Sequence, residues 1–377
     1  MLRFGFAGRR SSVAAPSRAS RPRTGYAAVI VGGGLHGLCV AQALAERHGV
    51  SDVAVLDARG VLRETAPPLL RLQDTASVFL DIYRAALPRW RRMAAPRRTR
   101  RRARGHVLLA HGDAAAAAHR FQAYLSAGAG LRYTGLDLDD LRRLCPGLAL
   151  FEGTHLAILE GSYLRDAAIP RVTEILHRMA GDAVRRGCHL LSGVAPVRLR
   201  TMGGRIAGIE TSHGIIHAER ILLTAPATTL SLAAGIGLAL PLQLEWTDRV
   251  TTMPLAPWLS PSVASEALGI ELWQADDGAI TVMGADAATR AVALFPALAA
   301  ATVATRLQVP CERTADGMPL LGPAGPDGLL VNAGWAGAAV WSAPVVADML
   351  ADALVGEIQA LPAAFSPRRF GPYVNAA

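Results

Sequence analysis

Residues 26–57 hold the feature that most constrains how this chain can fold: two apolar segments joined by a glycine-rich turn and a helix. Residues 27–31 are typical of a buried parallel strand, and the sequence Gly-Gly-Gly-Leu-His-Gly follows at once over 32–37. A helical pattern covers residues 38–48, and a second apolar strand over 53–56 ends at Asp57. This order of elements predicts a strand–helix–strand unit with a parallel sheet.

Each glycine in that turn has a distinct physical use. Gly32 allows the tight turn, Gly34 lets the backbone approach a pyrophosphate, and Gly37 lets the helix pack closely on the sheet. The helix that follows directs its N-terminal amides at the same anion. Asp57 lies 20 positions after Gly37, where a carboxylate meets a ribose hydroxyl. The segment therefore predicts a dinucleotide site rather than a ligand-free turn, without saying which dinucleotide.

The charge of the chain is concentrated in two segments. The 377 residues carry a net charge of +9 and include no lysine, so all 39 basic residues are arginines. Residues 1–25 and 89–104 hold 6 and 9 arginines without an acidic residue, so the remainder, 9 − 6 − 9 = −6, is mildly acidic. Arginines 97–104 could dock an acidic partner, a lipid or a nucleic acid. A solvated loop is the simpler interpretation, since no nucleic-acid-binding signature accompanies them.

The sequence favours a soluble, reduced, cytoplasmic protein. Residues 1–25 lack the apolar core of a secretory signal, and we interpret them as a disordered arginine-rich leader rather than an organellar transit peptide. Residues 221–244 are uncharged, but prolines and glycines interrupt them, which favours a strand, a loop and a short helix over a membrane span. The four cysteines show no metal or redox spacing.

The remaining elements alternate between helices and strands. A small β-meander is expected over 189–218, leading into a buried strand at 221–223, and the last helix is expected after Pro344. Further helices are expected at 75–93, 111–126, 138–144, 170–187 and near 294, and further strands at 105–110, 157–159, 242–246, 270–273, 279–283 and 328–332.

Six stretches, in order, resemble the D-amino-acid oxidase superfamily of FAD enzymes, and among them the sarcosine oxidase β subunits and related amine dehydrogenases. They are VIVGGGLHGL at 29–38, GHVLLAHGD at 105–113, LRRLCPGL at 141–148, GIETSHGIIHA at 208–218, TADGMPLLG at 314–322 and LLVNAGW at 329–335.

The resemblance implies an α/β fold, α+β in part. A Rossmann-type FAD-binding domain of the glutathione-reductase-like kind would hold an inserted mixed β-sheet substrate domain. The FAD-binding domain would comprise residues 26–85, 150–235 and 313–377, and the substrate or cap domain 86–149 and 236–312.

The resemblance also implies where non-covalent FAD binds. The turn from Gly334 to Ala339 would lie at the isoalloxazine ring, and Val194 would contact the adenine side through its backbone. The implied cofactor-binding residues are Gly32, Gly33, Gly34, Leu35, His36, Gly37, Asp57, Val194, Ala225, Gly334, Trp335, Gly337, Ala338 and Ala339.

The chain departs from the sarcosine oxidase pattern near the expected flavin. The family's Gly-Gly-Phe-Lys is replaced by Ala-Ala-Val-Trp at 338–341, so the lysine that aids reaction with oxygen becomes Trp341. Arg165 stands where a histidine carries covalent FMN in the sarcosine oxidase β subunit, so we expect no covalent FMN. Ala225-Pro226 replaces the usual Ala-Gly. The ADP-binding half is therefore expected to be intact and the catalytic half altered.

These residues lead to a functional hypothesis and two alternatives. We expect an FAD-dependent oxidoreductase that acts on the C–N bond of a secondary amine or amino acid and passes electrons to a partner subunit or another acceptor. Arg71 and Arg165 are the candidate carboxylate partners, and Trp341, with Trp273 and Trp335, a candidate pocket wall. One alternative is an FAD-binding but catalytically inactive structural subunit. The other, an NAD-dependent dehydrogenase, rests on the glycine turn alone.

Overall fold

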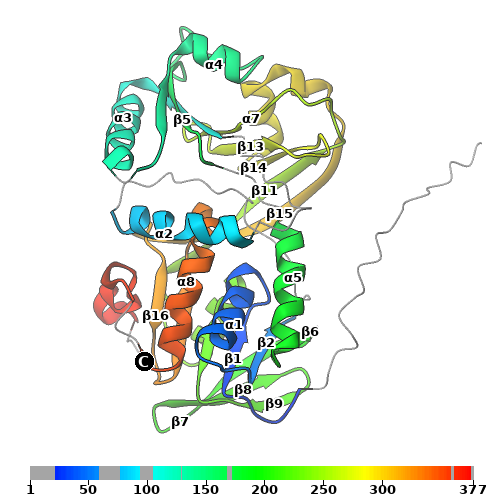
Figure 1. The fold of residues 1–377 in the computed structure, drawn as a ribbon, viewed down its shortest axis with the longest axis vertical. Coiled ribbons are helices and arrows are strands. Elements are labelled where there is room, and N and C mark those ends of the chain that lie inside the picture. Colours follow the sequence, from blue (N-terminus) through cyan, green and yellow to red (C-terminus); the bar gives the residue numbers. More distant parts are fainter. Residues whose placement is uncertain are drawn as a thin grey trace, which may run out of the picture.

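Two large β-sheets, one below the other in Figure 1, organise the protein. The computed structural model describes residues 22–58, 77–93, 105–128, 130–167, 172–357 and 361–374. The segment 97–104 and nearly all of the predicted leader lie outside the described residues.

The first sheet has 6 strands in the order β16-β17-β10-β1-β2-β6. All neighbours pair in parallel except β16, which runs antiparallel to β17. Its strands are β1 (Ala28–Val31), β2 (Val53–Asp57), β6 (His189–Ser192), β10 (Ile221–Leu223), β16 (Leu320–Pro323) and β17 (Leu329–Ala333).

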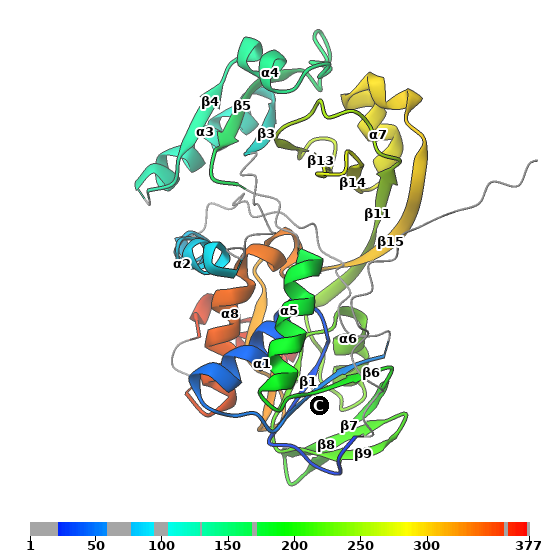
Figure 2. The same cartoon turned by 45° about the vertical axis from the view of Figure 1, so that its right-hand side comes forward.

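Layers on both faces bury this sheet, which is why β1, β2 and β10 are continuously apolar. Helices α1 (Leu35–Arg47), α5 (Val172–Arg185) and α8 (Ala339–Leu354) cover one face, and α2 (Ser77–Met93) packs on α8 (Figure 1). The other face lies against α6 (Pro226–Ala234) and a 3-stranded antiparallel sheet (Figure 2). That small sheet consists of β7 (Pro196–Met202), β8 (Arg205–Thr211) and β9 (Gly214–His217).

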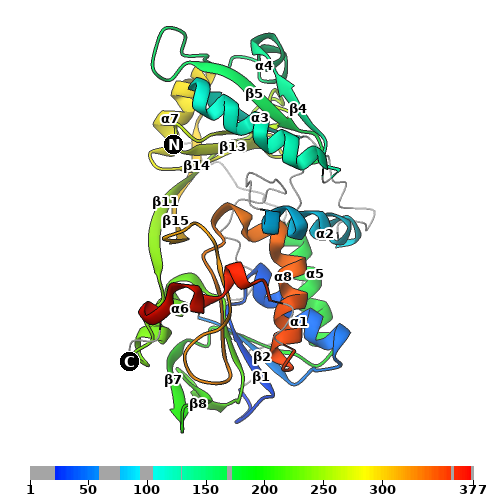
Figure 3. The ribbon, with the colours of Figure 1, turned by 90° about the vertical axis from the view of Figure 1, so that its left-hand side faces the viewer.

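The second large sheet has 8 strands in the order β15-β11-β14-β13-β12-β3-β5-β4, and it is mixed because β12 and β3 pair in parallel. The long strands β11 and β15 connect it to the first sheet (Figure 3). Its strands are β3 (His106–His111), β4 (Tyr133–Leu136), β5 (Ile158–Leu164), β11 (Leu242–Thr252), β12 (Ser262–Ser265), β13 (Ile270–Gln274), β14 (Ile280–Gly284) and β15 (Val303–Thr314). Helices α3 (Gly112–Gly128), α4 (Leu138–Leu144) and α7 (Ala287–Leu294) accompany them.

The structure corrects three details of the sequence-based expectations. Strand β6 pairs in parallel with β2 and belongs to the first sheet, so the meander contains only β7 to β9. Strand β5 lies between β3 and β4, so its residues belong to the second sheet although the predicted boundary at 150 places them in the FAD-binding domain. The last helix begins at Ala339 and contains Pro344 in its interior. The other domain boundaries stay predictions.

Helix α8 together with the turn before it is long and apolar enough to span a membrane, by length and composition. In the protein 67% of this segment, Ala336–Leu354, is buried, and α8 packs against α1 and α2. The core helix of a globular protein shows the same composition, so we treat α8 as core.

Candidate active site

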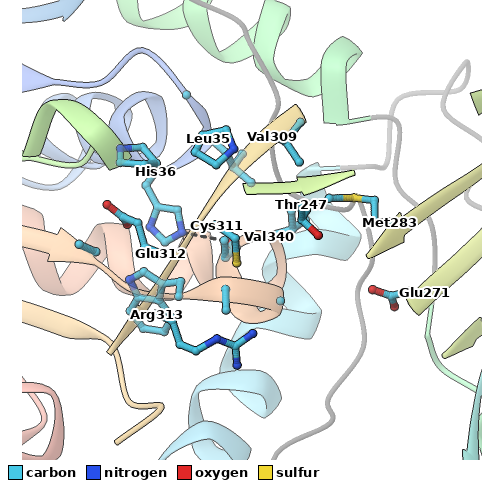
Figure 4. A pocket seen from close by; sticks show the side chains of 18 of the residues that line it. Leu35, His36, Thr247, Glu271, Met283, Val309, Cys311, Glu312, Arg313 and Val340 are labelled. Carbon is cyan, nitrogen blue, oxygen red and sulfur yellow. Dashed lines mark hydrogen bonds between the residues drawn. The ribbon is translucent and has the colours of Figure 1, made fainter. Parts of the chain in front are cut away.

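A cavity of about 430 Å³ lies between the two large sheets, a volume typical of small-molecule sites. One wall is the glycine turn after β1 together with the ends of β2, β10 and β17. The other wall comes from strands β11 to β15 of the second sheet. Figure 4 shows His36 and Glu312 on the side of the first sheet, and Met283 and Glu271 on the opposite side.

The sheet order arranges the first wall in a row. Because β2, β1, β10 and β17 are neighbours in that order, their carboxyl ends follow one another along one edge. Asp57 stands at the end of β2, the glycine turn follows β1, Thr224 follows β10, and Asn332 is near the end of β17. An elongated ligand with one end at Asp57 and its middle at the glycine turn would therefore reach Asn332 with its other end.

The glycine turn is built for close approach of its own backbone. A Cβ atom on Gly37 would lie 1.9 Å from the carbonyl oxygen of Gly32, so only glycine allows α1 to start at this position. Gly32 itself has a φ of 131°, and a Cβ there would lie 2.8 Å from the carbonyl oxygen of Thr224. Both glycines keep the turn tight against β1 and β10.

The N-terminus of α1 is prepared for an anion. Gly34 is its N-cap, no side chain caps it, and its first turn contains no acidic residue. The Oδ2 atom of Asp57 accepts a hydrogen bond from the Gly33 N–H at 3.0 Å, which joins the end of β2 to the turn. The unused amides and the helix dipole therefore face the cavity with a partial positive charge.

A hydrogen-bond network joins this turn to the ends of β10 and β17. The Asn332 amide donates to His36 Nδ1 and to Thr224 Oγ1, both at 3.0 Å, and accepts from the Trp335 indole N–H at 2.5 Å. His36 Nε2 donates to the Ala339 carbonyl at 2.7 Å. Both imidazole nitrogens are thus used in the neutral form, and burial lowers the pKa of His36 to about 4.

Glu312 on β15 is hydrogen-bonded to the turn that follows β17, at the end of that turn opposite to the one that His36 contacts. Its Oε2 accepts a hydrogen bond from the Gly334 N–H at 3.0 Å, while its buried Oε1 has no partner among the described residues. Burial raises the pKa of Glu312 to about 7, although the Gly334 hydrogen bond opposes the shift. The turn from Gly334 to Ala339 is therefore hydrogen-bonded to a titratable side chain at each end, Glu312 at Gly334 and His36 at Ala339. Within it Ala336 adopts a φ of 44°, a left-handed conformation that costs about 1–2 kcal/mol.

Comparison with known proteins decides the family. Residues 27–353 match the DAO family, described as FAD dependent oxidoreductase. The chain belongs to this family. It is 26% identical over 379 residues to "Sarcosine oxidase subunit beta" of Arthrobacter sp, covering 93% of this chain and 92% of the relative.

Solved structures share the fold. L-proline dehydrogenase from P. horikoshii superposes with a TM-score of 0.79 at 19% identity, covering 92% of this chain and 97% of that one. Glycine oxidase from Geobacillus kaustophilus superposes with a TM-score of 0.78 at 20% identity, covering 92% and 99%. The expected α/β fold and FAD-enzyme family are confirmed.

The residues present fit the FAD that this family uses. The uncapped start of α1 and the cradle at Gly32, which a Cβ would fill, suit a pyrophosphate, and Asp57 is placed for the adenosine ribose. Among the predicted cofactor-binding residues, those that line the cavity are Gly32, Gly34, Leu35, His36, Asp57, Ala225, Trp335, Gly337 and Ala339.

The other predicted cofactor-binding residues do not line the cavity. Gly33 and Gly334 donate backbone hydrogen bonds to Asp57 and Glu312, and the N–H of Ala338 donates to the Trp335 carbonyl. Val194 is buried in the core and follows Gly193, whose N–H donates to the Asp57 carbonyl at 2.8 Å. Gly37 supports the turn through its contact with Gly32.

Of the predicted catalytic residues, the two that the structure describes, Arg165 and Trp341, do not line the cavity. Arg71 lies outside the described residues. Arg165 is exposed at the end of β5 and does not line the cavity. Trp341 is 2% exposed and packs edge-to-face on Tyr83, with ring centroids 5.3 Å apart. Trp273 packs with Met283 and Val309, which themselves line the cavity.

The cavity residues that the sequence-based site prediction missed include Thr224, Glu271, Glu312 and Asn332. Asn332 could have been found because it lies in LLVNAGW at 329–335, one of the stretches that resemble the family. Thr224 could have been found as the residue after a buried strand at the carboxyl edge of the sheet. Glu271 and Glu312 lie on strands of the second sheet, and nothing local in the sequence marks them.

Proposed function

We propose that this chain oxidises the C–N bond of a small amine or amino acid with non-covalently bound FAD. FAD, when bound, supplies the acceptor for a hydride from the carbon beside the substrate nitrogen. The observation that carries the proposal is the cavity itself, which extends from the phosphate-binding turn to the second sheet. The similar proteins, a sarcosine oxidase subunit, a proline dehydrogenase and a glycine oxidase, support a small amine or amino acid as substrate.

The chain contributes binding, orientation and exclusion of water. The start of α1 holds the pyrophosphate, and the network around Asn332 fixes the turn from Gly334 to Ala339 relative to it. The apolar side chains Met283, Val309 and Val340 line the far part of the cavity and would keep a reacting substrate dry (Figure 4).

An amino-acid substrate also needs a partner for its carboxylate. Arg71 remains our first candidate from the sequence. Among the described residues that line the cavity, Arg313 carries the only guanidinium group, and its Nε lies 3.5 Å from Glu245 Oε2. Arg313 is therefore a second candidate for this role, because a guanidinium binds a carboxylate through two parallel hydrogen bonds.

The electron acceptor is proposed to be a partner protein or carrier rather than oxygen. The chain has no lysine that could assist reaction with oxygen. The curated relative is named as a subunit, which supports a heteromeric assembly, and arginines 97–104 are a candidate docking segment. The proposal includes a cytoplasmic location and no covalent FMN, since Arg165 replaces the histidine that would carry it.

An anaerobic reduction assay tests the proposal. The purified protein is expected to be yellow, and sarcosine, glycine, proline or an opine should bleach its visible absorbance without oxygen. Heat or acid should release FAD into solution, as expected for non-covalent binding. A colourless protein that takes up no flavin on reconstitution would refute the proposal.

A structural subunit that binds FAD without turnover is the second candidate. The alanines at 338 and 339 favour it, because their methyl groups stand where the sarcosine oxidase pattern has glycines. A yellow protein that no amine bleaches, but that dithionite reduces, would support this candidate.

A further inference from the structure

Among the described side chains that line the cavity, Glu312 is the one with a buried polar atom that has no hydrogen-bond partner. Its Oε2 is held by the Gly334 N–H, and its Oε1 is buried without a partner in the described part of the chain. A buried carboxylate oxygen without a donor is costly, so either a proton or a bound molecule completes its bonding.

The position of Glu312 indicates which end of the ligand it meets. Along the edge of the first sheet the order is Asp57, the glycine turn, Thr224 and then Asn332. With the adenosine end at Asp57 and the pyrophosphate at the glycine turn, the flavin end lies beyond β10 and β17. Gly334, which directly follows β17, is bonded to Glu312.

The surroundings of Glu312 hold no charge that compensates it. On its own strand Arg313 engages Glu245 of β11, and the thiol of Cys311 has a pKa raised by burial. Opposite Glu312 in the β11 register stands the apolar Leu244. His36 is neutral, and Glu271 on β13 faces the cavity from the other wall (Figure 4). The remaining charged residues of the lining are the acids Asp57 and Glu266.

We propose that Glu312 is the proton-holding group at the flavin end of this cavity. Its Oε1 takes up a proton from solvent when negative charge develops beside it and releases that proton when the charge is removed. No bond other than O–H forms or breaks at Glu312. The raised pKa of Glu312, about 7, allows both states near neutral pH. The inference rests on the proposed function only in requiring bound FAD.

The reduction potential of the FAD-loaded protein tests this role without any amine substrate. The potential is measured against redox dyes at pH 5.5 and pH 8.5 for the wild type, Glu312→Gln and Glu219→Gln. Glu312→Gln keeps the size of the side chain and an acceptor for Gly334 but cannot ionise. Glu219→Gln is the matched control, because Glu219 is an exposed carboxylate just before β10, at the end of that strand away from the cavity.

Ionised Glu312 should disfavour negative charge on the reduced cofactor. We therefore expect Glu312→Gln to have a more positive potential than the wild type at pH 8.5 and nearly the same potential at pH 5.5, whereas Glu219→Gln follows the wild type at both. An equal difference at the two pH values, or none, overturns the inference. If Glu312→Gln purifies without FAD, Glu312→Asp replaces it: a pH dependence of the potential displaced from that of the wild type supports the inference, and an identical one refutes it.

The result is distinguishable from failure of the proposed function. Dyes and dithionite reduce the cofactor whether or not any amine does. A protein that no amine bleaches can still show the expected pH-dependent difference, and an active amine oxidoreductase can fail to show it.

Discussion

Among the described glycines, Gly37 is the one at which an added methyl group would make the closest contact, so Gly37→Ala should disrupt the glycine turn. The added Cβ would lie 1.9 Å from the Gly32 carbonyl oxygen, whereas an ordinary contact is 3.4 Å or more. Helix α1 and the turn must therefore separate by about 1.5 Å, and the resulting strain is of order 1–3 kcal/mol or more. The same displacement moves the amides of α1 away from the anion. We expect the apoprotein to lose about that much stability and to bind FAD at least about tenfold more weakly.

Gly181→Ala is the matched control. Gly181 lies within α5, and its nearest neighbour, Arg185 Nη1, would be 3.4 Å from an added Cβ. Alanine is the better helix former by about 1 kcal/mol, so this variant should be as stable as the wild type or more stable. Urea unfolding of the apoproteins and fluorescence titration with FAD measure both effects. If Gly37→Ala unfolds and binds FAD like Gly181→Ala, the packing argument for the turn is wrong.

Three further predictions concern His36 and Trp341. The pKa of His36 is about 4 in the folded protein and 6.5 when unfolded, so the unfolded chain takes up a proton first as the pH falls. The stability that depends on neutral His36, about 3 kcal/mol, should be present above pH 6.5 and disappear as the pH falls through 4. Urea unfolding at pH 7 and pH 4 measures this contribution: the wild type should lose about 3 kcal/mol of stability through His36 between the two pH values, and His36→Gln should not. Trp341→Ala should cost about 3–5 kcal/mol, because the indole is buried against Tyr83 and Phe79, whereas Trp246→Ala should cost little at 57% exposure. In Trp341→Phe we expect amine-dependent bleaching at close to the wild-type rate. Loss of bleaching in a stably folded Trp341→Phe would instead support a role of Trp341 in the reaction, as the sequence predicts.

The geometry of the glycine turn could be predicted because its determinants are local. Gly32, Gly37 and Asp57 occupy one strand–helix–strand unit, and the spacing alone requires their geometry. The placement of β6 could also have been inferred, since α5 directly precedes it and a helix followed by a strand is typical of parallel pairing. The β-meander was favoured instead because short strands and turns alternate over 189–218; the last three of these strands do pair antiparallel.

The other half of the site depends on contacts that no local pattern encodes. Asn332 meets His36 only because β17 and β1 flank β10, although 296 positions separate the two residues in the chain. Glu312 reaches Gly334 from β15, a strand of the other sheet that the sequence analysis did not predict. Trp341 was placed near the flavin by the resemblance; its side chain is buried against α2, and its role at the flavin stays a prediction.

The two titratable groups at the ends of the turn from Gly334 to Ala339 shift in opposite directions for one reason. Burial penalises the charged form of each, lowering the pKa of His36 to about 4 and raising that of Glu312 to about 7. The unfolded chain releases the Glu312 proton near pH 4.5, so Glu312 costs stability progressively as the pH rises from about 4.5 to about 7. His36 costs stability as the pH falls from about 6.5 to about 4. In the folded protein both groups are neutral only between about pH 4 and about pH 7, and in that range neither end of the turn carries a buried charge. A bound cofactor that accepts charge at this turn must therefore be matched by a proton, and Glu312 is the group whose folded pKa lies where that proton is available.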